Sequence, residues 1–541
     1  MSDRLGQDKE SQSAGSNGGW SRRGLLRAGV SATLAAPLLL NGGRISAEDR
    51  AGQTLDSASA SGVIKDRLDQ GPFPITQDEG WMTLAVTTPT KLHIRNFGLG
   101  LVGYTWEENG PALRVRSGKQ KLADAIERMA SLPFVDVLYI RCDWRNVQSQ
   151  PGKLDLNPVF ELTRDAARRH NLRWAFRIQM SNPEFEPQQI AIPDFLRNQV
   201  PLVPVGKMTY HGRTTEFVEP RYDYPAFQRA FRELNELLAS KFDGDPLLEW
   251  MDLMQYGFWG ESHTNNLPNP FPNVYTAEQT FIHMTEFQLD TWKKTQLAVN
   301  TEPDISSVGN DQVRDLAVRN GCWLRSDSIV VEEPIQIDHL ANRPPWLGAI
   351  MEDGAYRQYD LSHMPLDAAG VPQRENAMLH VLDLGANYWS LWTEAENLEA
   401  YNEKYPEGFR ALQQRMGYRI RPAWVWQRKR QGTEEVIVGV SNDGVAGVPG
   451  VLRLTLEDAD GSLRVSGTLD RGQPYGGRIR EASLMLPPGL GAVDLKLTAQ
   501  LETKAGVLRK IRWACQQSLD SDGAFPIKLM APDDRRWRKG V

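Results

Sequence analysis

The stretch LLEWMDLMQYGFWGE, residues 247–261, is an apolar run that ends on a carboxylate, Glu261. A second run, PWLGAIME at residues 345–352, has the same form and ends on Glu352. Short apolar runs of this kind are typical of strands buried in a parallel sheet. If residues 98–417 form a (β/α)8 barrel, these runs close its fourth and seventh strands. Residues at the carboxyl ends of barrel strands face the mouth, so we expect Glu261 and Glu352 to meet there.

Strand-like and helix-like segments alternate through this region, which is the pattern of a parallel sheet. The fold class expected is α/β, a (β/α)8 TIM barrel followed by a C-terminal β-sandwich. The sandwich is indicated by short strands between Gly and Pro turns, at residues 436–441, 451–456, 463–468, 482–486 and 493–497. The eight barrel strands are expected at residues 99–106, 135–141, 173–179, up to 261, 295–300, 322–325, up to 352 and 387–392.

The N-terminus has the features of an export signal. The segment SRRGLL at residues 21–26 resembles the twin-arginine motif, a mildly apolar run follows at residues 28–40, and Ser46-Ala47 provides a small-residue cleavage site. This run is too short to span a bilayer and contains Pro37. A disordered tail with a chance arginine pair is the alternative. The expected organisation is a twin-arginine signal peptide at 1–47, a flexible linker at 48–75, the barrel at 76–419 and the sandwich at 420–541.

These features predict a periplasmic or secreted protein that engages the twin-arginine export machinery. No later stretch approaches about 18 apolar residues, so we expect no stable membrane anchor. The net charge of −6 over 541 residues argues against nucleic acid as a partner. Cys142, Cys322 and Cys515 lack metal or redox spacing, so neither a metal nor an organic cofactor is expected, and a structural disulfide stays open.

Glu261 has the surroundings of a general acid. It follows Tyr256, Phe258 and Trp259, whose rings partly exclude water from the carboxyl group. Loss of solvation disfavours the charged form, so we expect a raised pKa for Glu261. The alternative is a surface glutamate where a strand leaves the barrel.

Glu352 has the surroundings of a nucleophile. A carboxylate one step beyond a buried strand stays ionised if cationic or hydroxyl donors reach it. Arg141, Arg145 and Arg177, at neighbouring strand ends, are the candidate donors. The alternative is a helix N-cap or a loop acid, and Asp353 is a rival for the cap.

Other acids compete with Glu352 for the nucleophile role. Glu332 and Glu333 lie beyond the weak sixth strand and beside Pro334, where the start of a helix is the preferred interpretation. Glu302, after the fifth strand, stays a further rival.

Polar or aromatic side chains follow nearly every predicted strand. Sugars are bound by hydrogen bonds to polar side chains and by stacking on aromatic rings, so these residues are the expected binding ring. Each one taken singly is more often structural. The members are Tyr104, Trp106, Arg141, Asp143, Arg145, Arg177, Asn182, Trp259, His263, Asn300, Glu302, Asp327, Tyr388, Trp389 and Trp392.

The pattern resembles the retaining (β/α)8 glycoside hydrolases that carry an acid/base glutamate after strand four and a nucleophile after strand seven. More narrowly, it looks like the bacterial β-galactosidase-like barrel proteins. The resemblance lies in YIRCDW at 139–144, QPGKLD at 150–155, YDYPAF at 222–227, DLMQYGFWGE at 252–261 and MGYR at 416–419. It implies Glu261 as acid/base and Glu352 as nucleophile. One departure is Gly260, where the family usually has the Asn that holds the sugar 2-hydroxyl.

The function expected is an exported glycoside hydrolase that acts on oligo- or polysaccharide with retention, its carboxyl groups roughly 5–5.5 Å apart. A non-catalytic carbohydrate-binding barrel is the alternative. A metal-dependent barrel hydrolase or lyase ranks below both, because His263 is the one local histidine near the expected mouth and no metal-binding His spacing occurs.

Overall fold

The computed structural model describes residues 80–106, 118, 120–182, 190–210, 213–264, 267–301, 310–326, 334–353, 373–430, 432–531 and 538–539. The predicted signal peptide and linker lie outside the described residues, as do Glu302, Asp327, Glu332 and Glu333.

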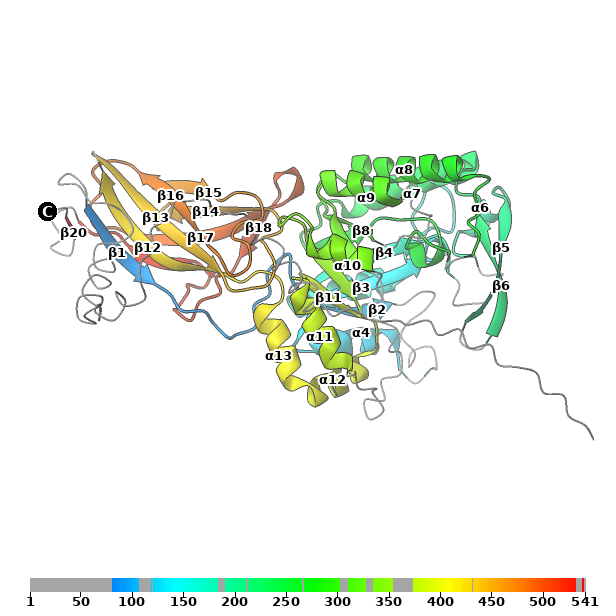
Figure 1. The fold of residues 1–541 in the computed structure, drawn as a ribbon, viewed down its shortest axis with the longest axis horizontal. Coiled ribbons are helices and arrows are strands. Elements are labelled where there is room, and N and C mark those ends of the chain that lie inside the picture. Colours follow the sequence, from blue (N-terminus) through cyan, green and yellow to red (C-terminus); the bar gives the residue numbers. More distant parts are fainter. Residues whose placement is uncertain are drawn as a thin grey trace, which may run out of the picture. The chain divides into compact units, whose positions relative to one another are not determined.

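A closed barrel of eight parallel strands lies between residues 100 and 391 (Figure 1). The prediction of a (β/α)8 barrel is therefore confirmed. Its strands are buried along their whole length, except for the first residue of one, which explains why they read as continuous apolar runs. In barrel order they are β10 (Ala349–Glu352), β11 (Tyr388–Leu391), β2 (Gly100–Trp106), β3 (Val135–Asp143), β4 (Arg173–Gln179), β7 (Leu248–Asp252), β8 (Leu297–Asn300) and β9 (Trp323–Ser326).

Amphipathic helices cover the barrel. In α7 (Pro225–Phe242), for example, Phe227, Phe231, Leu234 and Leu238 recur at helical spacing and are all buried. Full burial of each such side chain stabilises the fold by roughly 1.5–3 kcal/mol. The others are α4 (Leu122–Ser131), α5 (Val159–Arg169), α6 (Asp194–Arg197), α8 (Val274–Thr291), α9 (Asn310–Arg319), α10 (Pro334–Ala341), α11 (Gln373–Asp383), α12 (Ala395–Lys404) and α13 (Pro406–Arg415).

Two segments between β4 and α8 differ from expectation. The fourth barrel strand ends at Asp252, so Glu261 lies in the loop that follows it, after the 3-10 turn η3 (Phe258–Gly260). Gly257, with φ of 82°, turns the chain out of the extended conformation. The second difference is a hairpin, β5 (Leu202–Tyr210) and β6 (Arg213–Pro220), in a region where no strand was predicted.

Two antiparallel sheets form the C-terminal region. β1 (Gly80–Val86) pairs with β12 in the first of them, so residues 80–86 belong to this sheet rather than to the barrel. The first sheet also contains β13 (Thr433–Asn442), β16 (Ile479–Leu486) and β20 (Arg538–Lys539), beside β12 (Ile420–Arg430). The second contains β14 (Val451–Glu457), β15 (Arg464–Thr468), β17 (Asp494–Glu502), β18 (Leu508–Ile511) and β19 (Phe525–Lys528).

Contacts link these sheets to the barrel. The Arg509 side chain donates to the backbone oxygen of Pro246 at 2.7 Å, and the Lys504 amine donates to that of Trp292 at 3.2 Å. Within the sheets, Trp513 is buried and donates its indole N–H to the Leu497 oxygen at 3.0 Å. These contacts fit a bracing role for the sheets.

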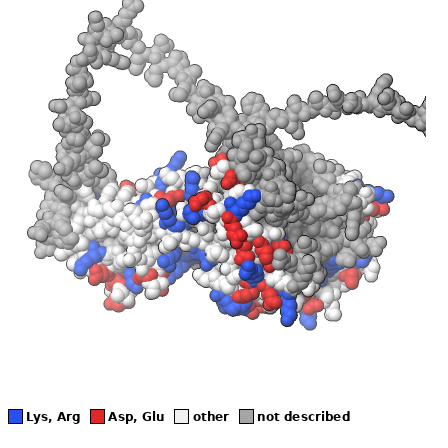
Figure 2. All heavy atoms as spheres, turned by 90° about the horizontal axis from the view of Figure 1, so that it is seen from below, with Lys and Arg blue, Asp and Glu red and all other residues white. Residues whose placement is uncertain are grey.

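Charges of both signs are mixed on the face seen in Figure 2. Ion pairs such as Arg168–Asp165, at 2.7 Å, join half-exposed or exposed side chains. Such pairs contribute about 0–1 kcal/mol each. Within the described part of the chain, no helix is long and apolar enough to cross a membrane.

Candidate active site

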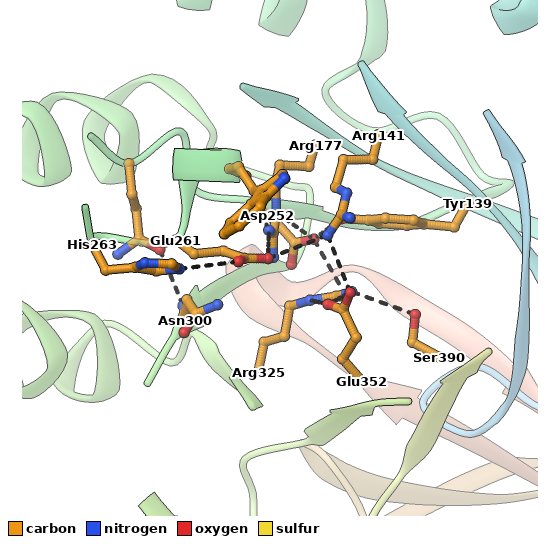
Figure 3. Close-up of polar contacts among 12 residues, drawn as sticks. Tyr139, Arg141, Arg177, Asp252, Glu261, His263, Asn300, Arg325, Glu352 and Ser390 are labelled. Carbon is orange, nitrogen blue, oxygen red and sulfur yellow. Dashed lines mark hydrogen bonds and ion pairs between the residues drawn. The ribbon is translucent and has the colours of Figure 1, made fainter. Parts of the chain in front are cut away.

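Glu261 and Glu352 lie together at the mouth of the barrel (Figure 3). Glu352 is the last residue of β10, and Glu261 follows η3. Nη1 of Arg141, on β3, donates to Oε1 of Glu261 at 3.2 Å and to Oε1 of Glu352 at 3.1 Å. The two predicted carboxylates are thus brought to the same cation, and all three side chains are only 2% exposed.

Two further arginines and one aspartate complete an arginine–carboxylate cluster. Nη1 of Arg177, on β4, contacts Oε1 of Glu261 at 2.5 Å. Arg325, on β9, contacts Oε2 of Glu352 through Nε at 3.1 Å and Nη2 at 2.5 Å. Asp252 Oδ2 lies 3.5 Å from both Arg177 Nε and Arg325 Nη1. The cluster is Arg141, Arg177, Arg325, Asp252, Glu261 and Glu352.

Glu352 is surrounded by hydrogen-bond donors. Besides the arginines, the hydroxyl of Tyr104 donates to its Oε1 at 3.2 Å. Burial raises the pKa of Tyr104 and the Glu352 charge raises it further, so this hydroxyl keeps its proton. The predicted donor Arg141 does reach Glu352. Arg177 instead contacts Glu261, Asp252 and the backbone oxygen of Trp259. Arg145 pairs with Asp143 at 3.1 Å.

Glu261 contradicts the expectation of a raised pKa. Burial does raise the pKa of this carboxyl, but Arg177, the hydrogen bond from His263 and Arg141 together outweigh it and lower the pKa to about 2. His263 Nε2 lies 3.4 Å from Oε2 of Glu261. The sequence argument considered only the neighbouring rings, and the cations come from strands far away in the chain. In this state Glu261 is a carboxylate at neutral pH.

The loop that carries Glu261 has a strained backbone. Trp259 and Ser262 adopt φ of 54° and 67°, which non-glycine residues adopt at a cost of order 1–3 kcal/mol each. Hydrogen bonds hold the loop in place: Trp259 N–H donates to the Ser181 oxygen at 3.1 Å, and Gly257 N–H donates to the hydroxyl of Tyr222 at 3.0 Å. The position of Glu261 is therefore fixed by its neighbours.

Another buried acid, Glu219 on β6, accepts hydrogen bonds from Ser181 and Tyr222, the two residues that hold this loop. The Ser181 hydroxyl donates to its Oε1, and the Tyr222 hydroxyl donates to its Oε2 at 2.6 Å. Burial raises the pKa of Glu219 to about 7, although both hydrogen bonds and the charge of His263 oppose the rise. On the same strand, the ring of Phe217 packs on Phe258 at 5.3 Å.

Several predicted ring residues lie around the cluster. The Arg141 guanidinium lies 5.1 Å from the ring centroid of Trp392, and the ring of Trp259 lies 5.5 Å from that of His263. Asn300 and Trp106 are buried at the ends of β8 and β2, and the backbone N–H of Asn300 donates to Gln255 at 3.2 Å.

Asp143 forms a group of its own at the end of β3. Its carboxylate accepts from Gln179 at 2.9 Å, Asn182 at 3.2 Å and Arg145 at 3.1 Å. Burial raises its pKa, and Arg145 opposes the rise.

Two predicted binding residues face elsewhere. Tyr388 donates from its hydroxyl to Glu249 at 2.5 Å and packs on Trp250 inside the barrel, near the first residues of the strands. Trp389 points outward, where its ring meets that of Tyr401 in α12. Successive side chains of a strand point to opposite faces, so Tyr388 lies inside the barrel and Trp389 lies on its outer surface. Neither side chain lies beside Glu261 or Glu352.

Sequence reasoning missed half of the polar residues that contact the two glutamates or their partners. Their common signal is a charged or hydroxyl side chain inside a buried strand, a rare placement unless the group is paired. They are Tyr139, Asp252, Arg325 and Ser390. Glu219 and Tyr222, beside the loop, were missed as well, and Tyr222 lies in a turn rather than in a strand.

Among the described residues, no group of three or more His, Cys, Asp or Glu side chains has a geometry that fits a metal ion. Cys142, Cys322 and Cys515 are buried free thiols.

Comparison with known proteins gives structural neighbours only. No family model matches the chain, and no curated protein matches it. Solved structures similar to it include glycoside hydrolases. A family 5 enzyme from Prevotella bryantii is 12% identical over 60% of this chain and 99% of its own, with a TM-score of 0.37. A β-amylase catalytic domain from Paenibacillus polymyxa is 9% identical over 56% and 94%, with a TM-score of 0.35. At these values the likeness says nothing about the substrate of this chain.

Proposed function

We propose that this protein is an exported glycoside hydrolase that cleaves oligo- or polysaccharide with retention of configuration. Glu352 is the nucleophile and Glu261 is the acid/base. One observation carries the proposal: the two carboxylates share a single nitrogen of Arg141, at 3.2 and 3.1 Å, at the mouth of a (β/α)8 barrel.

The shared nitrogen limits how far apart the two carboxylates can be. Their Oε1 atoms cannot be separated by more than the sum of these two distances, so the two carboxylates are neighbours, as the roughly 5–5.5 Å between the carboxyl groups of retaining enzymes requires. In inverting enzymes the carboxyl groups lie roughly 6.5–9.5 Å apart, which leaves room for a water between base and sugar. The geometry therefore favours retention.

The proposed reaction has two steps. A carboxylate oxygen of Glu352 bonds to the anomeric carbon as the glycosidic C–O bond breaks, and the leaving oxygen takes the proton of Glu261. Glu261 then takes a proton from water as the hydroxyl bonds to the anomeric carbon and Glu352 leaves. Arg325 and Tyr104 stabilise the Glu352 carboxylate whenever it is free.

Aryl glycosides test the proposal. We expect wild type to hydrolyse at least one member of a panel of galactosides, glucosides, fucosides and arabinofuranosides. Glu352→Ala should lose at least about 10³-fold in kcat, and added azide should restore turnover as a glycosyl azide of inverted configuration. Glu249→Gln is the matched control, because Glu249 is a buried acid in the same barrel, bonded to Tyr388. Full activity in Glu352→Ala would exclude the mechanism.

One observation favours a second candidate, a non-catalytic carbohydrate-binding barrel. Arg177, His263 and Arg141 hold Glu261 as a carboxylate with a pKa near 2, which is the wrong state for a general acid. A barrel of this kind would bind sugars without turnover. Sugar binding measured by calorimetry, unchanged in Glu352→Gln and unaccompanied by hydrolysis, would establish it.

The remaining expectations complete the proposal. Export through the twin-arginine machinery rests on the arginine pair at residues 22–23 and can be followed by fractionation of cells that express wild type or an Arg22→Lys, Arg23→Lys variant.

We also infer that the two C-terminal sheets pack face to face as a sandwich. Their inward residues, such as Val438 on β13 and Leu454 on β14, share one apolar cluster.

A further inference from the structure

A pocket of about 390 Å³ lies between α7 and α8, two helices that pack against each other outside the barrel strands (Figure 1). None of the residues that line it belongs to the arginine–carboxylate cluster. Its volume falls in the range of roughly 300–1,000 Å³ in which proteins bind small organic molecules. The polar residues that line it are Asp223, Gln228, Arg229, Arg232, Thr280 and His283.

The basic side chains of this pocket have no acidic partners. Within the described part of the chain, Arg229, Arg232 and His283 form no ion pair with a carboxylate. The Arg232 guanidinium lies 5.1 Å from the ring centroid of Phe287, which leaves its charge unmatched. Arg229 and Arg232 are three positions apart on one helix, an unfavourable spacing for like charges. Two arginines and a histidine therefore line one pocket without an anion.

The acids closest to them in the chain are engaged elsewhere. Asp223, which also lines the pocket, accepts from Nε and Nη2 of Arg221 at 2.7 and 2.6 Å. Oε1 of Glu233 accepts from the side chain of Gln148 at 2.8 Å and from the backbone N–H of Gly152 at 2.5 Å. Neither acid neutralises the pocket arginines.

Arginines on α5 provide a contrast. Arg168 pairs with Asp165 at 2.7 Å, and Arg169 pairs with Glu127 at 2.6 Å. These side chains are exposed, as Arg229 and Arg232 are, yet each has a carboxylate within reach. Exposure alone therefore does not account for the missing partners in the pocket.

We propose that this pocket binds an acidic sugar, a saccharide unit that carries a carboxylate, sulfate or phosphate group, with the anionic group held by Arg229, Arg232 and His283. Guanidinium groups suit all three anions, because their planar N–H groups match pairs of oxygen atoms. The site is separate from the two glutamates, so the inference does not depend on the proposed hydrolase function.

The shape and chemistry of the lining favour a sugar over a bare inorganic anion. From Pro225 to Arg232 the lining extends about 10 Å along the axis of α7, further than a sulfate or phosphate reaches. The carboxylate of Asp223 would repel a bare anion, whereas its oxygens can accept hydrogen bonds from sugar hydroxyls. Gln228 and Thr280 add polar groups that can bind further hydroxyls.

Calorimetry on the full chain tests the proposal. Galacturonate, glucuronate, galactose 6-sulfate and glucose 6-phosphate are compared with glucose, galactose, sodium sulfate and sodium phosphate at constant ionic strength. We expect one acidic sugar to bind at least about tenfold more tightly than both its neutral parent and the inorganic anions. The acidic sugar that binds most tightly identifies the anionic group.

Paired double variants locate the binding. Arg229→Gln with Arg232→Gln should weaken binding of the acidic sugar by at least about tenfold and leave kcat on aryl glycosides unchanged. Arg168→Gln with Arg169→Gln, on α5, is the matched control and should leave the affinity unchanged. Circular dichroism checks that both variants fold. Glu352→Gln should also bind the acidic sugar as wild type does, because the pocket lies apart from the glutamates.

Three results would overturn the proposal. They are no binding of any acidic sugar, binding no tighter than that of the inorganic anions, and binding that persists in the Arg229→Gln, Arg232→Gln variant. A variant with lysine at both positions keeps the charges but loses the planar N–H groups. Its affinity should fall below that of wild type, and an unchanged affinity would show charge attraction alone rather than a formed site. The hydrolase function stands or falls separately, on Glu352→Ala.

Discussion

Glu261 and Glu352 are joined through one atom, Nη1 of Arg141, which lies within hydrogen-bond distance of both carboxylates. Two carboxylates this close repel each other unless a cation lies between them. We predict that Arg141→Gln lowers kcat by about 10²-fold or more, because the proposed catalytic pair loses its shared cation. It should also lower the free energy of unfolding by roughly 3–5 kcal/mol, as breaking a buried pair does.

Urea denaturation and steady-state kinetics check both effects of Arg141→Gln. Arg164→Gln, which breaks the partly exposed pair with Asp245 at 2.9 Å, is the control. A stable and fully active Arg141→Gln variant would show that Arg141 is not needed to hold the two carboxylates together.

The low pKa of Glu261 predicts a stability change in acid. In the folded state this pKa is about 2, below the 4.5 of an ordinary glutamate, so the unfolded chain binds more protons between these values. The free energy of unfolding therefore gains a contribution, on the order of 3 kcal/mol, that is fully present above pH 4.5 and lost as the pH falls toward 2. In Glu261→Gln this contribution is absent. Urea denaturation from pH 6 to pH 3 should show a shallower decline for the variant, and parallel curves would contradict the prediction.

Glu219 predicts the opposite slope. Its folded-state pKa of about 7 lies above 4.5, so the folded chain binds more protons between these values. The Glu219 contribution to the free energy of unfolding is fully present below pH 4.5 and declines as the pH rises toward 7. Glu219→Gln can keep both contacts, with Ser181 and Tyr222, but cannot ionise. We expect it to flatten the decline between pH 5 and 8 in denaturation curves, whereas Glu219→Leu loses the contacts and lowers kcat by about tenfold.

Two glycines in the Glu261 loop offer a matched pair of substitutions. A Cβ on Gly257 would lie 2.1 Å from the backbone oxygen of His263, whereas a Cβ on Gly260 meets nothing closer than 3.6 Å. Both have positive φ, 82° and 71°. Gly257→Ala should therefore displace the loop and lower kcat by at least about 10²-fold, with a loss of more than about 2 kcal/mol in the free energy of unfolding.

Gly260→Asn should fold with a cost below about 1 kcal/mol, because Asn tolerates this backbone conformation and has room here. Denaturation followed by circular dichroism, together with kcat, compares the stability and activity of Gly257→Ala and Gly260→Asn. If the Asn variant were the less stable, the loop geometry described here would be wrong.

The barrel was predictable because its strands are buried on both sides and its helices are amphipathic, two patterns that a single chain displays directly. Glu261 and Glu352 were correctly brought together by the rule that strand ends meet at one mouth. The end of the fourth strand was misplaced by nine residues, since the apolar run continues through Leu253, Met254 and Tyr256, which pack against the helices rather than within the sheet.

The electrostatics of the site were not predictable from local sequence. Arg177 lies 84 residues from Glu261, and Arg325 lies 27 residues from Glu352, so their pairing depends on barrel closure. The positions of Tyr388 and Trp389 were also not predictable. A shift of one position along a strand moves a side chain to the opposite face, and the sequence does not fix that position.

The pairing of β1 with β12 means that the barrel interrupts the C-terminal sheet, and this fixes an order of events during synthesis. The hydroxyl of Thr87 donates to the backbone oxygen of Pro422 across 335 residues, so the ribosome makes β1 long before its partner exists. Closing so large a loop in an unfolded chain is entropically costly, but a folded barrel already brings its two ends together, as the hydrogen bond from Tyr418 to Phe97 shows. We therefore expect the barrel to form before β1 joins the sheet, which leaves the edge of β1 unpaired during synthesis.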